Sequence, residues 1–328
     1  MISTLQFNKS SALAYLLDGN GGTRTVDTNE IAAWTPQDGN LWVHLNYNNS
    51  EEIKWLTDSS ALEPLVVEAL LAEETRPRTT VIGDGLLIAL RGVNLNPGAD
   101  PEDMVSIRLW VDSTRIVTTR KRELISVTDL INQFNTKKGP CNSAEFLVEL
   151  VDRLIWRMSE TVDQFEDRVA ELEEMVLAVD SSSLRYELAT LRRQAISIRR
   201  YLAPEREALS RLIIEKVSWL DDGSRLQLRE VNDRLIRHIE DIDAVRERAA
   251  VTQEELQSRL SEQMNSRMYV LSVVAAIFLP LGFLTGLLGV NVGGIPGTDY
   301  PMAFLVFTGM LVVVVVLQVL LFRWKKWM

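Results

Sequence analysis

Short apolar runs alternate with turn-forming residues over roughly the first 120 positions, and this pattern predicts strands joined by tight turns. The runs predicted as strands are Leu13–Leu17, 41–45, 86–90 and 104–111. Residues 61–74 carry apolar side chains at helical spacing and predict one helix. Strands mixed with a helix indicate a small α/β domain, which we place at residues 1–142.

From about Ser143 the apolar side chains recur every three or four residues, which predicts long amphipathic helices. The first helix begins there, and a second, over about 182–219, is expected to kink or break near Pro204. A third helix starts near Ser224 and has no helix breaker before Pro280, so it is predicted to run to that proline or beyond. We therefore assign residues 143–222 to an acidic helical pair and residues 223–267 to a stalk helix.

The stalk helix carries an apolar seam with alternating steps of three and four residues, the spacing of a heptad repeat. Its members are Leu228, Val231, Leu235, His238, Ile242, Val245, Ala249, Thr252 and Leu256. Such a seam is typical of self-association or of antiparallel packing. We expect His238 to pack in this seam and His44 to be a structural residue of a strand.

Two uncharged segments close the chain, residues 268–290 and residues 301–322. Each is longer than the about 20 residues that cross the hydrocarbon core of a bilayer, and the short Gly/Pro-rich link 291–300 makes them a transmembrane hairpin. Arg267 precedes the hairpin and the basic tail 323–328 follows it, whereas the link has no base. The positive-inside rule therefore places both termini in the cytoplasm and the link in the periplasm.

Charge and composition exclude several functions. Residues 1–266 hold 31 basic and 44 acidic side chains, a balance of −13, whereas nucleic-acid binders carry a basic face. The sequence has no glycine-rich phosphate loop, so we expect no nucleotide partner. With one cysteine and two histidines it lacks both a cysteine zinc cage and a nucleophile beside a base. We expect neither an enzyme nor a resident cofactor.

Small residues recur along the first span at Ala275, Gly282, Gly286 and Gly289. This spacing permits close helix packing, and it can equally line a narrow pore with backbone. Pro280 lies in mid-span and frees one backbone carbonyl. That carbonyl is either an ion ligand of a pore or the by-product of a plain kink.

Acidic side chains supply the candidate cation sites. On the first long helix these are Glu160, Asp163, Glu166, Asp167, Glu171, Glu173 and Glu174. They form either a solvated helix face or, in several copies around one axis, a carboxylate cluster that concentrates and binds cations. Asp299 is the only charge in residues 268–322, and a ring of such residues would attract cations at the outer side.

The end of the first span resembles the CorA superfamily of divalent-cation channels and transporters. The residues that carry the resemblance are Gly289-Val290-Asn291, the short loop after them, and a second span that ends in Lys325-Lys326-Trp327. The superfamily signature at this place is Gly-Met-Asn, and the valine variant is similar to the zinc-transporter branch, ZntB. Residues 42–47, 74–78 and 200–204 resemble the same branch, so the likeness covers essentially the whole chain.

The resemblance implies a funnel-shaped homopentamer with the first span around a pore, the second against lipid, and the acidic domains in the cytoplasm. It places five Asn291 side chains at the outer mouth, where their oxygens would hold a hydrated cation. The positions it places on the pore side are Met268, Leu271, Ala275, Leu279, Gly282 and Gly286. Met268, Leu271 and Leu279 would form apolar constrictions that gate by dewetting.

The predicted function is a divalent-cation transporter of the bacterial inner membrane, with zinc as first substrate and cadmium, nickel and cobalt as companions. Proton coupling and the direction of transport stay open. One alternative is a magnesium or cobalt channel of the same architecture. The other is a non-transporting, membrane-anchored coiled-coil scaffold, which the heptad seam would suit.

Overall fold

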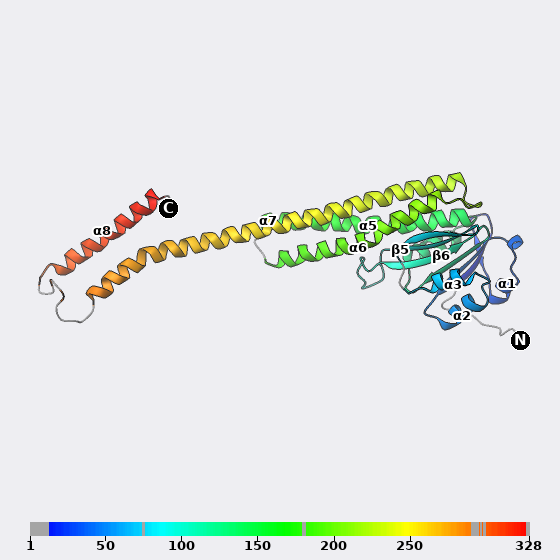
Figure 1. The fold of residues 1–328 in the computed structure, drawn as a ribbon, viewed down its shortest axis with the longest axis horizontal. Coiled ribbons are helices and arrows are strands. Elements are labelled where there is room, and N and C mark those ends of the chain that lie inside the picture. The colour runs from blue at the N-terminus through cyan, green and yellow to red at the C-terminus, as the bar shows by residue number, and fades with distance from the viewer. Residues whose placement is uncertain are drawn as a thin grey trace. The chain divides into compact units, whose positions relative to one another are not determined.

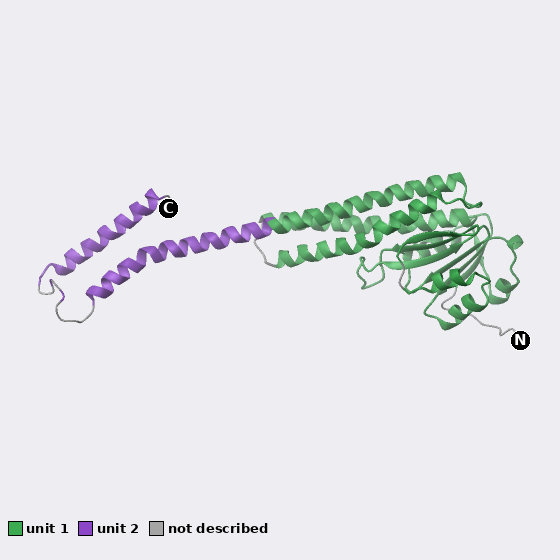
Figure 2. Ribbon diagram, in the orientation of Figure 1, with its two compact units in different colours: residues 1–254 green, residues 255–328 purple. Residues whose placement is uncertain are grey.

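The computed structural model describes residues 13–73, 76–178, 182–289, 295, 297 and 300–325 (Figure 1). The chain divides into two compact units, residues 1–254 and residues 255–328 (Figure 2). The first unit is an α/β domain with long helices, and the second holds two apolar helical segments. The predicted fold class of an α/β domain, a long helix and two apolar helices is confirmed.

The described strands form one sheet in the order β2-β1-β3-β7-β6-β5-β4. Their bounds are β1 Leu13–Leu17, β2 Thr23–Thr25, β3 Leu41–Asn46, β4 Arg78–Ile82, β5 Gly85–Gly92, β6 Val105–Val111 and β7 Arg115–Arg120. Only the central pair β3 and β7 runs parallel, with Val43 opposite Val117, and the other described pairs are antiparallel. The four predicted strands are confirmed, whereas β2, β4 and β7 are additions.

Helices cover both faces of the sheet. The short ones are α1 Thr28–Ala33, α2 Ser50–Asp58, α3 Pro64–Leu71 and α4 Ile125–Asn135, with a 3-10 turn at Pro36–Asp38. On one face Trp55 and Leu56 of α2 and Leu70 of α3 pack against Leu45 and Val117. On the other face Trp42 packs at tilted angles against Phe134 of α4 and Phe146 of α5. The helix predicted at 61–74 is α3, which starts at the proline because that residue suits the first helical position.

Three long helices pack beside this domain: α5 Ser143–Ala178, α6 Ser182–Ile214 and α7 Asp222–Leu288. Of the predicted kink or break at Pro204, the break does not occur, because α6 continues through the proline; the helix ends at Ile214, before the predicted end near 219. The sheet holds this part of α6. Thr79 donates to the Ala208 carbonyl at 2.8 Å, and Glu205 accepts from the Arg91 amide at 3.0 Å.

The heptad seam of α7 is buried inside a single chain. From Leu228 to Thr252 all eight of its side chains are less than 9% exposed. Arg234 binds Asp152 of α5 at 2.9 Å, and Arg248 holds both carboxylate oxygens of Glu173 at 2.9 and 2.6 Å. The second pair lies closer to the C-terminus than the first on both helices, so α7 runs parallel to α5. The helix α6, which lies between them in the sequence, runs antiparallel to both (Figure 1). The seam therefore holds three helices of one chain together and is not free for self-association.

Candidate functional site

The end of α7 and the helix α8 Ala303–Trp324 form the second unit. Both contain a stretch that is long and apolar enough to cross a membrane, and neither stretch is buried inside the chain. An apolar helix of this length without protein cover fits a bilayer and not a soluble core.

One face of each apolar helix is partly buried against the other helix. On α7 this face consists of Val273, Ala276, Ile277, Pro280, Leu281 and Leu284. On α8 it consists of Ala303, Phe307, Leu311, Val314, Val315, Gln318 and Val319. A hydrogen bond of 3.3 Å from Gln318 to the Ala276 carbonyl joins the two faces.

The six residues predicted to line a pore lie on the opposite face of α7. At about 100° per residue their mean direction is roughly half a turn from the face that meets α8. All six are exposed; Met268, Leu271 and Leu279 are 61%, 69% and 74% exposed. A methyl group added at Gly282 or Gly286 would meet no atom within 4 Å apart from the adjacent backbone of its own helix. This face is therefore available to other copies of the chain or to a water-filled path.

The signature motif Gly289-Val290-Asn291, which we predict to select the ion, falls at the border of the described residues. Gly289 donates its amide to the Thr285 carbonyl at 2.9 Å and follows the last residue of α7. Val290, Asn291 and Asp299 lie outside the described residues. Their assigned roles stay predictions.

The carbonyl that Pro280 frees already has a protein donor. Because proline has no N–H, the carbonyl of Ala276 lacks its usual helical partner. Gln318 of α8 donates to it, on the face away from the predicted pore side. We therefore withdraw this carbonyl as a candidate ion ligand.

The acidic candidates on α5 do not meet within one chain. Glu173 is bound by Arg248 of α7, and Glu171 pairs with Arg168 on its own helix. Glu160, Asp163, Asp167 and Glu174 are exposed, and Glu166 is half-buried. Across the part of the chain that the structure describes, no three His, Cys, Asp or Glu side chains are placed to hold a metal ion.

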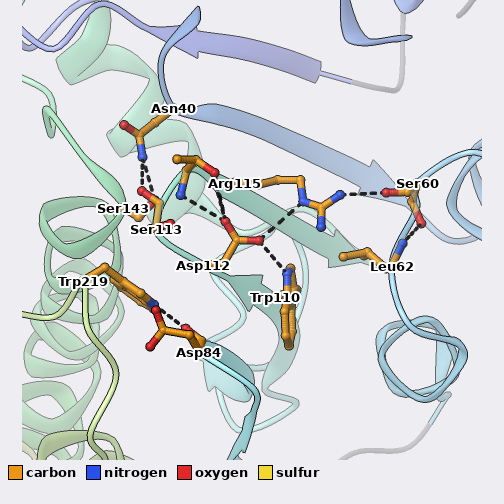
Figure 3. A network of polar contacts seen from close by, with 11 residues as sticks. Asn40, Ser60, Leu62, Asp84, Trp110, Asp112, Ser113, Arg115, Ser143 and Trp219 are labelled. Carbon is orange, nitrogen blue, oxygen red and sulfur yellow. Dashed lines mark hydrogen bonds and ion pairs between the residues drawn. The ribbon is translucent and has the colours of Figure 1, made fainter. Parts of the chain in front are cut away.

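Polar contacts attach the sheet to the ends of the long helices (Figure 3). Asn40, just before β3, donates to the Ser143 hydroxyl at the start of α5 at 2.8 Å. The turn between β4 and β5 holds the segment before α7, because Trp219 donates to the Asp84 carbonyl and Ser218 to its carboxylate. These bonds tie the sheet to the start of α5 and to the segment that leads into α7.

A second polar group in Figure 3 fixes the turn between β6 and β7. Asp112 accepts from the Trp110 indole at 3.2 Å and from the Arg115 amide at 2.8 Å. The Arg115 guanidinium in turn donates to the Ser60 carbonyl at 2.7 Å. These bonds tie the central parallel strand to the loop after α2.

Glu205 and His44 are buried titratable groups of the first unit, and both are expected to be neutral near pH 7. Burial raises the pKa of Glu205 to about 8, and the Arg91 amide and charge lower it only in part. Burial, with the nearby charge of Arg120, lowers the pKa of His44 to about 3. The His44 ring contacts the Thr118 hydroxyl at 2.7 Å, as expected of a structural histidine. Burial also lowers the pKa of His238, which contacts the Ser159 hydroxyl.

We expect the substitution Glu205→Gln to remove one pH dependence of stability. The folded carboxyl, with a pKa of about 8, keeps its proton where an unfolded one, near 4.5, has lost it. The unfolded state therefore binds fewer protons in this window, and the wild-type free energy of unfolding falls as pH rises through it. Glutamine stays neutral, so the advantage of the variant should grow with pH.

The measurement is the apparent unfolding temperature of the full-length protein in detergent at a series of pH values from about 5 to 8. The matched control is Glu207→Gln, because Glu207 is exposed on the same helix. That control should run parallel to the wild type. A Glu205→Gln curve parallel to the wild type would contradict the raised pKa.

Sequence reasoning missed Glu205 and Gln318. Glu205 directly follows Pro204. Because we expected the helix to kink or break there, the sequence offered no reason to expect a buried side chain. Gln318 is the only side chain of its span with a carboxamide, which was a signal, because an amide in a span needs a partner.

Comparisons with known proteins agree with this arrangement. A model of the CorA-like Mg2+ transporter protein family matches residues 37–325. The chain is 38% identical over 315 residues to the zinc transport protein ZntB of Yersinia enterocolitica, covering 96% of this chain and 95% of that protein. It is 40% identical over 324 residues to the divalent cation transporter CmaX of Pseudomonas aeruginosa, covering 96% of each. The structure of full-length CmaX matches 98% of this chain and 99% of its own with a TM-score of 0.86, at 39% identity.

Proposed function

The chain belongs to the CorA-like Mg2+ transporter protein family, and from this premise we propose that it carries divalent cations across a membrane, with zinc as its first substrate. The observation that carries the proposal is the exposed face of α7. It holds all six predicted pore positions, and it lies opposite the face that α8 covers.

The proposed path runs along the axis of a homopentamer. Two helices of one chain cannot enclose water, whereas five copies of the exposed α7 face can surround a narrow channel. The α8 helices would then face the lipid. Met268, Leu271 and Leu279 would form apolar rings that stop conduction when they lose water.

Zinc is placed first because Val290 stands where the superfamily signature has methionine and because a relative of 38% identity is a zinc transport protein. Cadmium, nickel and cobalt are the proposed companions. A magnesium or cobalt channel of the same architecture is the second candidate, favoured by the magnesium transporter family that matches the chain. Asn291 and Asp299 are the groups proposed to collect and hold the hydrated ion at the outer mouth.

We place the protein in the bacterial inner membrane with both termini and the acidic first unit in the cytoplasm. The basic residues Arg267, Arg323 and Lys325 flank the hairpin on its proposed inner side. The scaffold alternative has lost its main support, because the heptad seam is occupied within the chain. Any proton coupling would need groups outside the spans, since Tyr269 is their only titratable side chain.

Liposomes loaded with a zinc-sensitive dye test the proposal. We expect zinc added outside to enter liposomes that contain the full-length protein and to stay outside protein-free ones. Entry that rises with an imposed pH gradient would establish proton coupling, and entry that is indifferent to it a passive channel. Magnesium entry without zinc entry would favour the second candidate. Entry of neither ion would refute transport.

A further inference from the structure

Pro280 leaves one polar group of α7 without a helical partner in the middle of an apolar span. The missing N–H of proline would have bonded the Ala276 carbonyl, one turn earlier. In hydrocarbon no water can replace that donor, so an unpaired carbonyl is costly there. The chain must supply a donor from elsewhere or bear this cost.

Gln318 of α8 supplies the donor. Its side-chain amide nitrogen lies 3.3 Å from the Ala276 oxygen, and the residue belongs to the partly buried face of α8. Its amide oxygen is buried and has no partner among the described residues. The orientation of the amide is therefore set by the Ala276 carbonyl, because a flipped amide would place oxygen against oxygen.

The serine and threonine side chains of the two spans bond within their own helix. Ser272 donates to the Met268 carbonyl at 2.8 Å, and Thr285 donates to the Leu281 carbonyl at 2.9 Å. Thr308 on α8 donates to the carbonyl of Phe304 in the same way, at 2.8 Å. The contact of Gln318 differs because it joins the two helices, and it does so at the turn that Pro280 has opened.

We propose that Gln318 is a positioning residue, which completes the hydrogen bonding of α7 at Pro280 and thereby holds the rotation of the first span. Ala276 faces α8, and Ala275 and Leu279 beside it belong to the exposed face. Holding the Ala276 carbonyl toward α8 therefore keeps Leu279 and Gly282 turned to the other side. The effect on a cation path rests on the proposed function, whereas the hydrogen-bond role does not.

A double-mutant cycle between Pro280 and Gln318 tests this role. Pro280→Ala restores the N–H that Ala276 lacks, so the Gln318 donor becomes unnecessary. We expect Gln318→Leu to lower the apparent unfolding temperature of the full-length protein in detergent by a few degrees when Pro280 is present. In the Pro280→Ala background the same change should have little effect.

The matched control is Val319→Ala, because Val319 is an apolar residue that is partly buried on the same face of α8. It should lower the unfolding temperature equally in both backgrounds. An equal loss for Gln318→Leu in both backgrounds would reduce Gln318 to packing and overturn the proposal. The absence of any loss in the Pro280 background would overturn it as well.

Zinc entry into liposomes is the second readout. We expect Gln318→Leu to reduce zinc entry and the pair Gln318→Leu with Pro280→Ala to recover part of it. Coupled unfolding temperatures with unchanged zinc entry would refute the positioning of the path while keeping the hydrogen bond. If the wild type carries no zinc, the proposed function fails, and the unfolding cycle still decides the role of Gln318.

Discussion

The substitution Gly282→Leu should reduce zinc entry to the level of protein-free liposomes while the chain itself stays folded. Gly282 lies on the exposed face of α7, and a Cβ atom added there meets no atom within 4 Å apart from the adjacent backbone of its own helix. The exposed position of Gly282 therefore turns a leucine side chain away from the hairpin of its own chain. In a pentamer built around this face, five leucine side chains would add an apolar ring that narrows the path and excludes water.

Gly309→Leu is the matched control, because Gly309 is a glycine in the other span with equally open surroundings. At about 100° per residue it points away from the face of α8 that meets α7, and thus toward lipid in the proposed arrangement. This variant should carry zinc as the wild type does. Equal loss in both variants, or loss in neither, would contradict the assignment of the exposed α7 face to a pore.

Replacement of Asn291 by alanine should abolish zinc entry and leave the oligomer intact. An asparagine oxygen can replace part of the water around a hydrated cation, and a methyl group cannot. Loss of one such contact costs about 1–3 kcal/mol. Because a ring presents five contacts to the same ion, the combined effect should take the flux to background. The measurements are zinc entry and the size of the detergent-solubilised oligomer.

Thr298→Ala is the control for a change in the same loop. It should leave both entry and oligomer size unchanged. A scaffold would not respond to either substitution. Zinc entry at the wild-type level in the Asn291→Ala variant would therefore contradict the proposed ring of Asn291 side chains at the outer mouth. A smaller oligomer would instead place Asn291 in assembly and not in ion binding.

Local patterns predicted a large part of this protein. The two spans follow from the absence of charge over more than 20 residues, which no soluble core helix needs. The long helices follow from a period of three and four residues. The strands β4 and β7 escaped prediction because they are rich in threonine and arginine, and their burial depends on the strands beside them.

The site divides in the same way. The exposed α7 face could be drawn from the resemblance and the helical period, because both depend on residues a few positions apart. The donor that replaces the missing N–H of Pro280 could not be predicted, because Gln318 lies 42 residues away from Ala276 along the chain. Its contact exists only because the hairpin brings α8 against α7.

By itself the sequence determined the membrane hairpin, the α/β domain, the long helices and the family, since each is encoded in runs or motifs of neighbouring residues. Only the tertiary structure decided that the seam of α7 packs against α5 and α6, that α6 passes through Pro204, and that Gln318 closes the gap at Pro280. From the sequence alone it follows that the apolar seam must be covered and that the carbonyl freed by Pro280 needs a donor. Which distant residue provides the cover or the donor depends on how the folded elements pack, and patterns of neighbouring residues do not contain this information.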